Sequence, residues 1–465
     1  MKQLVLPGFE NKKLGDNLFE RANDPRIIYY LGSKYRILPS IVKQISKLVT
    51  PNGRVCDLFS GSGSVAVALS EYWDVTTVDI QEYSRVITNA LLTPIPNIDP
   101  LGWNSLWKTA ASSPLRKKMI ESLSELLKIE KDAIELSQQG FPNKLSELLR
   151  VNPLVSDEYE YIKSEDYLLT AQNEAKLNLK KFGLDRGPDT VITRYYGGVY
   201  FSWQQSIDLD SLLTLIFKTD RILRDHLLTA VFGAASAAVN TIGKHFAQPI
   251  QIMTPTGELK KNLVPQTIRD RTVDIFAFFH EWQERLTRMR RRVGNYQSIR
   301  ADYRDALNDK ENRFDLVYAD PPYTRDHYSR FYHILETMSL HDEPIVSTTS
   351  IRSKDRQRLS RGLYRSDRYQ SPFSIKSQAS KAFEELGRQV RSRDIPMVLS
   401  YSPFNSQSGN RPRLVTIDKI VEILKNYFSY VEVDPITGFS HSKFNREDRN
   451  VLVDGNAEVL IICKP

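Results

Sequence analysis

Short apolar runs of strand length recur toward both ends of the chain, and several of them lead directly into an acidic residue. Residues 314–319 are such a run, followed by Asp320, and residues 74–78 are expected to form a further strand, followed by Asp79. Continuous apolar segments of this length are typical of strands buried in a parallel sheet. Further strands are expected at residues 54–59, 296–301, 397–401, 430–433 and 459–463. The pattern predicts an α/β protein whose sheet has helices on both faces.

The long stretch between these groups of strands has the helical period, with an apolar residue every three or four positions. Helices are expected near residues 115–135, 210–221, 225–244 and 275–293. The aromatic segment 194–203 surrounds Gly197-Gly198, which suggests either a hairpin or a small packed core, and we favour the core. Residues 96–296 are therefore expected to leave the sheet and return to it as a large, mainly helical inserted domain.

The strand that ends at Ala319 is followed by Asp320-Pro321-Pro322-Tyr323, the most informative segment of the chain. Proline has no N–H for a sheet ladder and fixes its own φ, so the chain must turn here as a stiff corner. The corner presents a carboxylate, carbonyl groups and an aromatic ring. These groups suit a flat base held by its exocyclic amine, although a turn that merely ends the strand has the same composition.

A second motif follows the strand at residues 54–59, where Gly61 and Gly63 form a tight turn before a helix. Glycines let the backbone approach a ligand, and the helix N-terminus favours negative groups. Asp79 ends the next strand, where a carboxylate can hold ribose hydroxyls. Alone, this stretch also fits a nicotinamide-binding fingerprint, Gly61-x-Gly63-x-x-Ala66, or a turn without a ligand.

The motifs taken together, in their order, resemble the adenine-specific DNA methyltransferases of the Dam-like alpha group. In that family a Gly-x-Lys segment precedes an Asp-x-Phe-x-Gly-x-Gly loop, a long insert and an Asp-Pro-Pro-Tyr corner. This chain has the first at Gly32-Ser33-Lys34, the second at residues 57–63 and the last at residues 320–323. Residues 328–342 and 398–402 resemble the family's next segments. The resemblance implies a Rossmann-like methyltransferase sheet.

The resemblance also implies a reaction, the direct transfer of a methyl group from S-adenosylmethionine to the 6-amino group of a flipped-out adenine in double-stranded DNA. Asp320 and the carbonyl of Pro321 would accept the amine hydrogens, Pro322 would complete the corner and Tyr323 would stack on the base. The implied cofactor contacts are Tyr30, Gly32, Lys34, Asp57, Phe59, Gly61, Gly63, Asp79 and Asp302. Asp302 has a second interpretation, the N-cap of a helix from Tyr303, and the two roles can coexist.

Composition agrees with a cytoplasmic, globular protein. Of 465 residues, 41% are hydrophobic, yet no apolar run reaches membrane-spanning length and residues 1–7 lack the apolar core of a signal peptide. The two cysteines, Cys56 and Cys463, lie in strand-like runs, which indicates buried thiols rather than a disulfide or a metal site. We therefore expect no membrane partner and no bound metal.

The net charge of +8 permits a polyanionic partner, and its distribution is more informative than its size. Basic residues crowd the end of the helix predicted at 275–293 and the polar stretch after the proline corner. Either group has the ordinary interpretation of a solvated surface; we favour DNA contact for the second, because it follows the corner. The predicted DNA-binding residues are Arg288, Arg291, Arg292, Arg352, Lys354, Arg356, Arg358, Arg361 and Lys443.

The predicted organisation has three parts: an N-terminal extension at 1–26, a catalytic domain formed by 27–95 and 297–465, and an inserted DNA target-recognition domain at 96–296. By resemblance the protein is a site-specific DNA adenine methyltransferase of restriction-modification or phage defence, with cognate restriction or defence proteins as partners. A monomer is expected, because one chain supplies the cofactor site, the corner and the reader.

Three alternatives stay open. The corner serves any flat amine, so an amino-methyltransferase acting on cytosine amino groups or on RNA is the first. The long insert favours duplex DNA, and Asp rather than Ser at position 320 favours adenine by resemblance. A nicotinamide oxidoreductase would leave the corner and Gly32-Ser33-Lys34 unexplained. A catalytically silent DNA-binding subunit is the third alternative.

Overall fold

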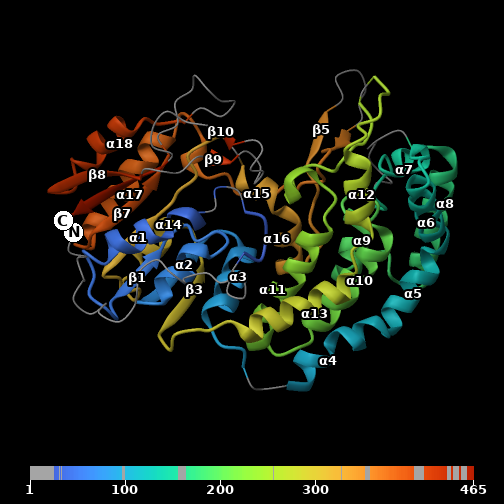
Figure 1. Ribbon diagram of the computed structural model, residues 1–465, viewed down its shortest axis with the longest axis horizontal. Coiled ribbons are helices and arrows are strands. Elements are labelled where there is room, and N and C mark those ends of the chain that lie inside the picture. Colours follow the sequence, from blue (N-terminus) through green and yellow to red (C-terminus); the bar gives the residue numbers. More distant parts are fainter. Residues whose placement is uncertain are drawn as a thin grey trace.

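A mostly parallel sheet lies between helices at one half of the molecule, and a group of helices fills the other half (Figure 1). A computed structural model describes residues 26–30, 32, 34–96, 100–155, 164–254, 256–325, 327–350, 357–402, 413–436, 441–442, 450–451 and 458–465. The predicted α/β fold is confirmed, and every run predicted as a strand forms one, with ends shifted by a few residues.

The central sheet has seven strands within the described part of the chain. They are β1 (Arg54–Asp57), β2 (Asp74–Asp79), β3 (Tyr296–Arg300), β4 (Leu316–Ala319), β7 (Met397–Tyr401), β8 (Tyr430–Ile436) and β11 (Glu458–Lys464). Their order is β3-β2-β1-β4-β7-β11-β8, and only β11 runs against its neighbours among them. Chain order reverses between β1 and β4, so a ligand crevice is expected outside the carboxyl ends of these two strands.

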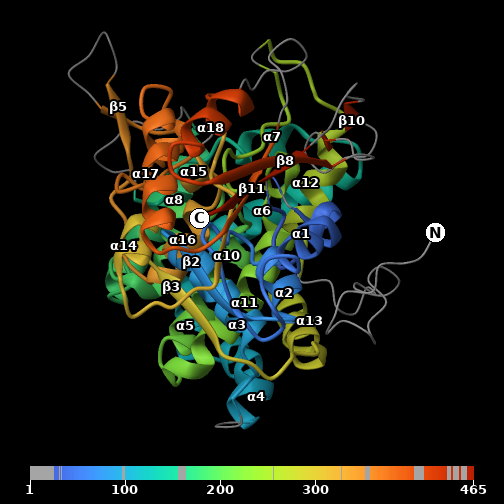
Figure 2. The same cartoon turned by 90° about the vertical axis from the view of Figure 1, so that its left-hand side faces the viewer.

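The alternation of side chains along each strand divides the core between two faces. On β4, Leu316 and Tyr318 join one apolar cluster and Val317 and Ala319 join the other. The first face is covered by α1 (Leu38–Ile45) and α2 (Ser64–Ser70); the second by α14 (Tyr303–Asn308), α17 (Ala379–Ser392) and α18 (Ile417–Leu424). Figure 2 shows the sheet edge-on between these groups.

The chain between β2 and β3 is helical wherever it is described as regular structure. Its helices are α3 (Glu82–Leu92), α4 (Pro100–Ala111), α5 (Pro114–Ser122), α6 (Ser124–Gln138), α7 (Asn143–Leu148), α8 (Asp166–Lys181), α9 (Val191–Tyr196), α10 (Trp203–Ile216), α11 (Arg221–Ala238), α12 (Leu263–Arg271) and α13 (Ile275–Arg288). One apolar core runs from α3 through α10 and α11 to α16 (His333–Leu340). The helical excursion, the chain between β2 and β3, therefore packs against the sheet half through a shared apolar core.

Local caps explain where the predicted helix boundaries were wrong. The helix expected from residue 210 begins at Trp203, because Ser202 and Gln205 form a reciprocal capping box. Asp220 caps α11 by accepting a hydrogen bond from the Ile222 N–H. The single helix expected at 115–135 is two helices, because Leu123 between them has a non-helical backbone.

The aromatic segment around Gly197 is a packed core and not a hairpin. Gly197 follows α9, and α10 begins only a few residues later, at Trp203. Tyr196, Tyr200 and Trp203 are fully buried. The hairpin interpretation of residues 194–203 is therefore wrong, and the core interpretation is confirmed.

Small antiparallel pairs lie outside the central sheet. They are β5 (Thr348–Ser350) with β6 (Gln357–Leu359) and β9 (His441–Ser442) with β10 (Asn450–Val451). Both cysteines are free and buried, as predicted. Among the described helices, none has the length and apolar character needed to cross a bilayer.

Candidate active site

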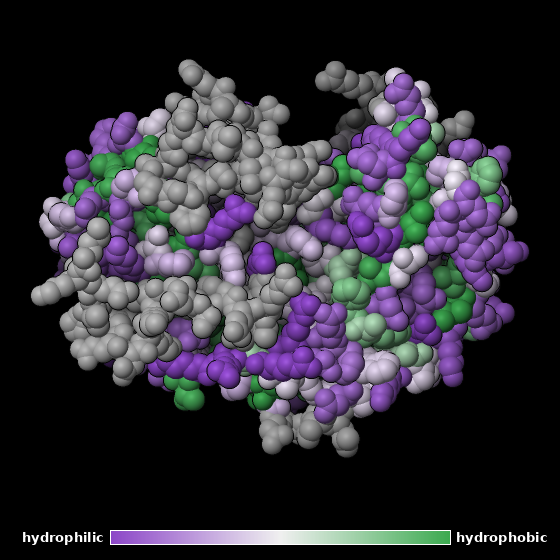
Figure 3. All heavy atoms as spheres, viewed as in Figure 1, coloured by the Kyte–Doolittle hydropathy of each residue, from purple (hydrophilic) through white to green (hydrophobic). Residues whose placement is uncertain are grey.

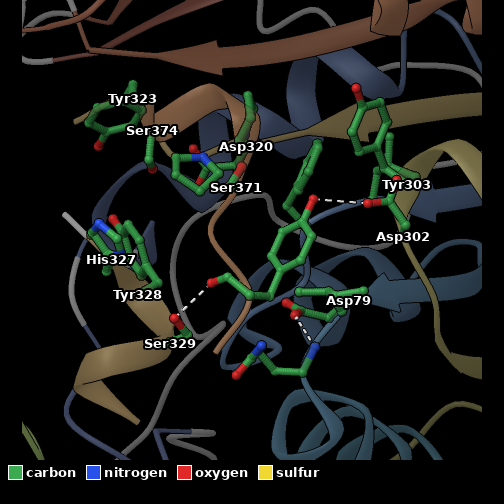
Figure 4. A pocket seen from close by; sticks show the side chains of 18 of the residues that line it. Asp79, Asp302, Tyr303, Asp320, Tyr323, His327, Tyr328, Ser329, Ser371 and Ser374 are labelled. Carbon is green, nitrogen blue, oxygen red and sulfur yellow. Dashed lines mark hydrogen bonds between the residues drawn. The ribbon is translucent and has the colours of Figure 1, made fainter. Parts of the chain in front are cut away.

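A pocket opens at the carboxyl ends of the central strands, as the crevice between β1 and β4 requires. Figure 4 shows Asp79 and Asp302 on one side of it, and His327, Tyr328 and Ser329 on the other. Its lining includes Tyr30, Gly32, Lys34, Phe59, Asp79, Asp302, Asp320, Pro321, Pro322, Tyr323, Tyr328, Ser329, Tyr369, Ser371 and Ser374. The fold thus brings together most of the residues predicted for catalysis and cofactor binding, from segments far apart in sequence.

Asp320 is a partly buried acid at the tip of β4. Its Oδ2 lies 2.9 Å from the Lys34 ammonium, whereas its Oδ1 is buried without a hydrogen-bond partner. Burial raises the pKa of Asp320 to about 6, although Lys34 opposes that rise. The corner therefore offers one unused carboxylate oxygen, the acceptor that a substrate N–H requires.

Lys34 was predicted to contact the cofactor, and the structure places its ammonium between two carboxylates. Besides Asp320, it lies 3.4 Å from Oε1 of Glu458, at the start of β11. The Lys34 and Glu458 side chains are 6% and 5% exposed, so the arrangement is shielded from water. Glu458 escaped sequence analysis, because a single acid before a strand carries no signal of its partner.

Aromatic rings form the wall around the corner. Tyr323 packs edge-on against Tyr401 at a ring distance of 5.4 Å and has the Arg413 guanidinium 4.5 Å from its centre. Tyr30 stacks on Tyr332 at 5.0 Å, and Tyr328 lies 6.1 Å from Tyr30. Flat rings around a carboxylate give a site that suits an aromatic heterocycle.

The glycine loop has the backbone that its residues suggest. Gly61 and Gly63 have φ of +51° and +78°, which other residues adopt only with strain. A Cβ at Gly61 would also lie 2.5 Å from the Tyr30 hydroxyl oxygen. The Gly61 N–H donates to Asp79 Oδ2 at 2.9 Å, so the loop is tied to the tip of β2.

Asp57, at the end of β1, is a buried acid whose charge has no ion-pair partner among the described residues. It is 1% exposed and its Oδ2 has no hydrogen-bond partner. Burial, with the charges of Asp320 and Asp79, raises the pKa of Asp57 to about 8. Such an orphaned acid fits a ligand that brings a cationic group or N–H donors.

Asp302 follows β3 and caps α14, so its N-cap interpretation is confirmed. Its carboxylate also accepts hydrogen bonds from the Arg304 guanidinium at 2.8 and 2.9 Å and from the Tyr369 hydroxyl at 2.9 Å. Burial alone would raise the pKa of Asp302, but the Arg304 hydrogen bonds lower it. Tyr369, which the sequence did not reveal, is held at its carbonyl by the Ser329 hydroxyl.

A second aromatic wall lies at this end of the pocket. The Phe59 ring meets Phe373 edge-on at 5.5 Å and Tyr303 at 5.6 Å. Phe59 was predicted from its motif. Phe373 had no such signal, because its role depends on the chain returning to β1 from far downstream.

The predicted DNA-binding arginines fall into two groups. Arg291 donates to the carbonyls of Ala90 and Leu91, and Arg292 pairs with Asp74 at 3.0 Å. Asp74 begins β2, so Arg292 lies at the amino end of that strand, whereas the pocket opens at the carboxyl ends of the strands. Arg291 thus ties the segment after α13 to the end of α3, and Arg292 ties it to the sheet, so we do not propose either as a DNA contact.

The remaining basic residues differ in their positions. Arg288 is exposed on α13 and pairs with Glu284. Arg358 on β6 and Arg361 just after it are exposed. Arg352, Lys354, Arg356 and Lys443 lie outside the described residues.

Known proteins with related sequences bear on this site. The family described as D12 class N6 adenine-specific DNA methyltransferase matches residues 30–173 and 275–386, together more than half of the chain. These ranges contain the glycine loop and the proline corner.

Two curated relatives carry modification-enzyme names. The chain is 23% identical over 408 residues to the modification methylase LlaI of Lactococcus lactis subsp. lactis, covering 86% of this chain and 48% of that protein. It is 22% identical over 329 residues to the type II methyltransferase M.FokI of Planomicrobium okeanokoites, covering 70% of this chain and 38% of that protein. The chain thus spans about half, or less, of the curated relatives it matches.

Proposed function

We propose that this chain, which belongs to the D12 class of N6 adenine-specific DNA methyltransferases, methylates the 6-amino group of adenine in double-stranded DNA. The observation that carries the proposal is the unpartnered Oδ1 of Asp320 at the rim of an aromatic pocket. A buried acceptor of this kind needs an N–H donor, and an exocyclic amine supplies one.

The proposed cofactor is S-adenosylmethionine, which when bound supplies a methyl group activated by its positive sulfur. The residues fit it in three places. Asp79 at the tip of β2 suits the ribose hydroxyls, and Asp302 beside the Phe59 wall suits the adenine ring. The unpartnered Oδ2 of Asp57 suits the cofactor's cationic end.

Asp320 would act on the substrate amine. The lone pair of that nitrogen is delocalised into the purine ring, and hydrogen bonds to Asp320 Oδ1 and the Pro321 carbonyl would draw the nitrogen toward a tetrahedral shape. The freed lone pair would form the new N–C bond as the methyl–sulfur bond breaks with its electron pair left on sulfur, and the nitrogen would then lose one proton to Asp320 or to water. Tyr323 would hold the plane of the base, so that much of the rate comes from orientation.

The target amine is inaccessible inside a duplex, so the adenine must be flipped out to reach the pocket. Figure 3 shows hydrophilic side chains on the described surface between the half that holds the sheet and the half that holds the helices. We propose that the duplex lies there, with the helical excursion as the reader of DNA sequence. Arg358 and Arg361, which follow the proline corner along the chain, are candidates for phosphate contacts.

The biological role we infer is modification of specific sites, alongside a restriction or defence system. The names of the two relatives, a modification methylase and a type II methyltransferase, support this role. The described residues contain a complete pocket, which favours action as a monomer.

The proposal is tested by incubating the protein with labelled S-adenosylmethionine and mixed-sequence duplex DNA, then identifying the modified nucleosides by mass spectrometry. We expect N6-methyladenine. Formation of N4-methylcytosine, or of a modified nucleoside in RNA alone, would show that the substrate is not adenine in duplex DNA. Binding of cofactor and DNA without any modified nucleoside would indicate a silent DNA-binding subunit.

A further inference from the structure

Glu458 is a nearly buried acid that no described step of the reaction uses directly. It begins β11, the reversed strand of the sheet, and is 4% exposed. Its Oε1 accepts a hydrogen bond from the Ser400 hydroxyl at 2.9 Å and lies 3.4 Å from the Lys34 ammonium. The same ammonium lies 2.9 Å from Asp320 Oδ2. One cation is thus shared by two carboxylates.

An arrangement of this kind is costly unless it serves the site. A buried carboxylate loses its hydration, and here two acids share one ammonium, so the group keeps a net negative charge. An apolar residue at position 458 would avoid that cost and leave Lys34 paired with Asp320 alone. Glu458 therefore competes with Asp320 for the Lys34 ammonium. Its negative charge raises the pKa of the Asp320 carboxyl, whereas Lys34 lowers it.

Sharing one ammonium also fixes which oxygen of Asp320 faces Lys34. A lysine ammonium is a point charge on a flexible four-carbon stem, so a single partner does not set its position. Ser400 on β7 holds Glu458 by a hydrogen bond, Glu458 on β11 anchors the ammonium, and Asp320 Oδ2 faces that anchored ammonium. That orientation leaves Oδ1 as the oxygen without a partner.

We propose that Glu458 is a positioning residue that acts through Lys34 to orient the Asp320 carboxylate and to keep its negative charge available to the substrate amine. The inference rests on the proposed methylation of an amine. It assigns to β11, the last strand along the chain, a role that neither the glycine loop nor the proline corner contains.

The test compares Glu458→Gln with wild type in single-turnover methylation of DNA at saturating cofactor. Glutamine keeps the shape and the Ser400 hydrogen bond but removes the charge. We expect the rate to fall roughly 10- to 100-fold, the size of effect that small misplacements of reacting groups produce. Affinities for DNA and S-adenosylmethionine should change less than the rate.

The decisive readout is pH dependence. Without the Glu458 charge, Lys34 acts on Asp320 unopposed, so the midpoint at which the rate rises with pH should move below that of wild type. Glu458→Asp should recover part of the rate. The matched control is Glu130→Gln, which removes a buried glutamate that pairs with Arg271 in the helical half; it should leave the midpoint unchanged.

An unchanged midpoint, or a rate loss equal to that of Glu130→Gln, would overturn the inference. Failure of the proposed function is recognised separately, because wild type would then form no N6-methyladenine. In that case carbon-13 NMR of the labelled carboxyl groups, with Asp320→Asn for assignment, still measures the Asp320 midpoint. A midpoint equal in wild type and Glu458→Gln would overturn the inference there too.

Discussion

The Tyr369 hydroxyl donates a hydrogen bond to Asp302 Oδ2 at 2.9 Å, which joins the segment after the proline corner to the end of β3. The Tyr369 carbonyl accepts from Ser329, next to Tyr328 in the pocket wall. Tyr369 therefore links Asp302, which is proposed for the cofactor adenine, to Ser329 on the opposite side of the pocket.

This link predicts the effect of Tyr369→Phe. Losing a hydrogen bond to a carboxylate costs about 1–3 kcal/mol when the group is well shielded, and less here because the pair is half-exposed. We expect a several-fold weaker affinity for S-adenosylmethionine with little change in maximal rate, measured by calorimetry and saturation kinetics. Tyr427→Phe is the control, because Tyr427 bonds to Glu384 on the surface. Equal effects from both variants would contradict the prediction.

The pKa of Asp320 predicts how activity depends on pH. Burial raises that pKa to about 6, and the proposed role needs the ionised carboxylate. The single-turnover rate should therefore rise with pH through about 6 and level off above it. A rate that is constant from pH 5 to 8 would show that the ionisation of Asp320 does not limit the reaction.

Asp57 predicts a pH effect on stability instead. Its folded pKa of about 8 lies above the ordinary value of 3.8, so the folded state holds a proton that the unfolded state releases. Its contribution to stability is present at low pH and is lost as pH rises through about 8. Asparagine at position 57 does not titrate, so Asp57→Asn does not lose stability in this way. Without cofactor, the melting temperature of the variant minus that of wild type should therefore increase by a few °C between pH 5 and pH 8.

The matched variant for this experiment is Asp210→Asn. Asp210 is also buried, and burial raises its pKa to about 7, but its two oxygens accept hydrogen bonds from the N–H groups of Ile192 and Thr193. We expect that substitution to lower the melting temperature, because a backbone donor loses its acceptor. Asp57→Asn should in addition weaken cofactor binding. A melting difference that does not change with pH would count against the unpaired charge at Asp57.

The arginines separate structural from DNA-contacting roles. Arg292→Ala removes the ion pair with Asp74 and should lower the unfolding free energy by about 1–3 kcal/mol with little effect on DNA affinity. Arg361→Ala should lower the melting temperature less than Arg292→Ala does, weaken DNA binding and reduce its salt-dependence slope by about one. The opposite pattern, measured by melting and salt-titrated binding, would reverse the two assignments.

The sequence was most informative where the chemistry is contiguous along the chain. Asp320 and the prolines, or Gly61 and Gly63, are neighbours in sequence, so their local geometry follows from residue type. The pairings of Lys34 with Glu458 and of Asp302 with Tyr369 join distant segments, and no local pattern specifies them.

The arginines at and after the end of α13 show that a cluster of charges does not reveal its partners. Their clustering suggests phosphate contact, whereas carbonyls at the end of α3 and an acid at the start of β2 bind two of them. Charge alone does not reveal which acceptors the fold brings near. The boundaries of α10 and α11, in contrast, could have been read from Ser202 and Asp220, because capping residues act on their own helix.

The most direct test of the central claim is single-turnover formation of N6-methyladenine by wild type and by Asp320→Ala, with DNA and cofactor binding measured for both. If Asp320 holds the substrate amine, the variant should bind both ligands and lose about 10³-fold or more of the rate. A variant that binds both ligands and methylates adenine at the wild-type rate would contradict the account.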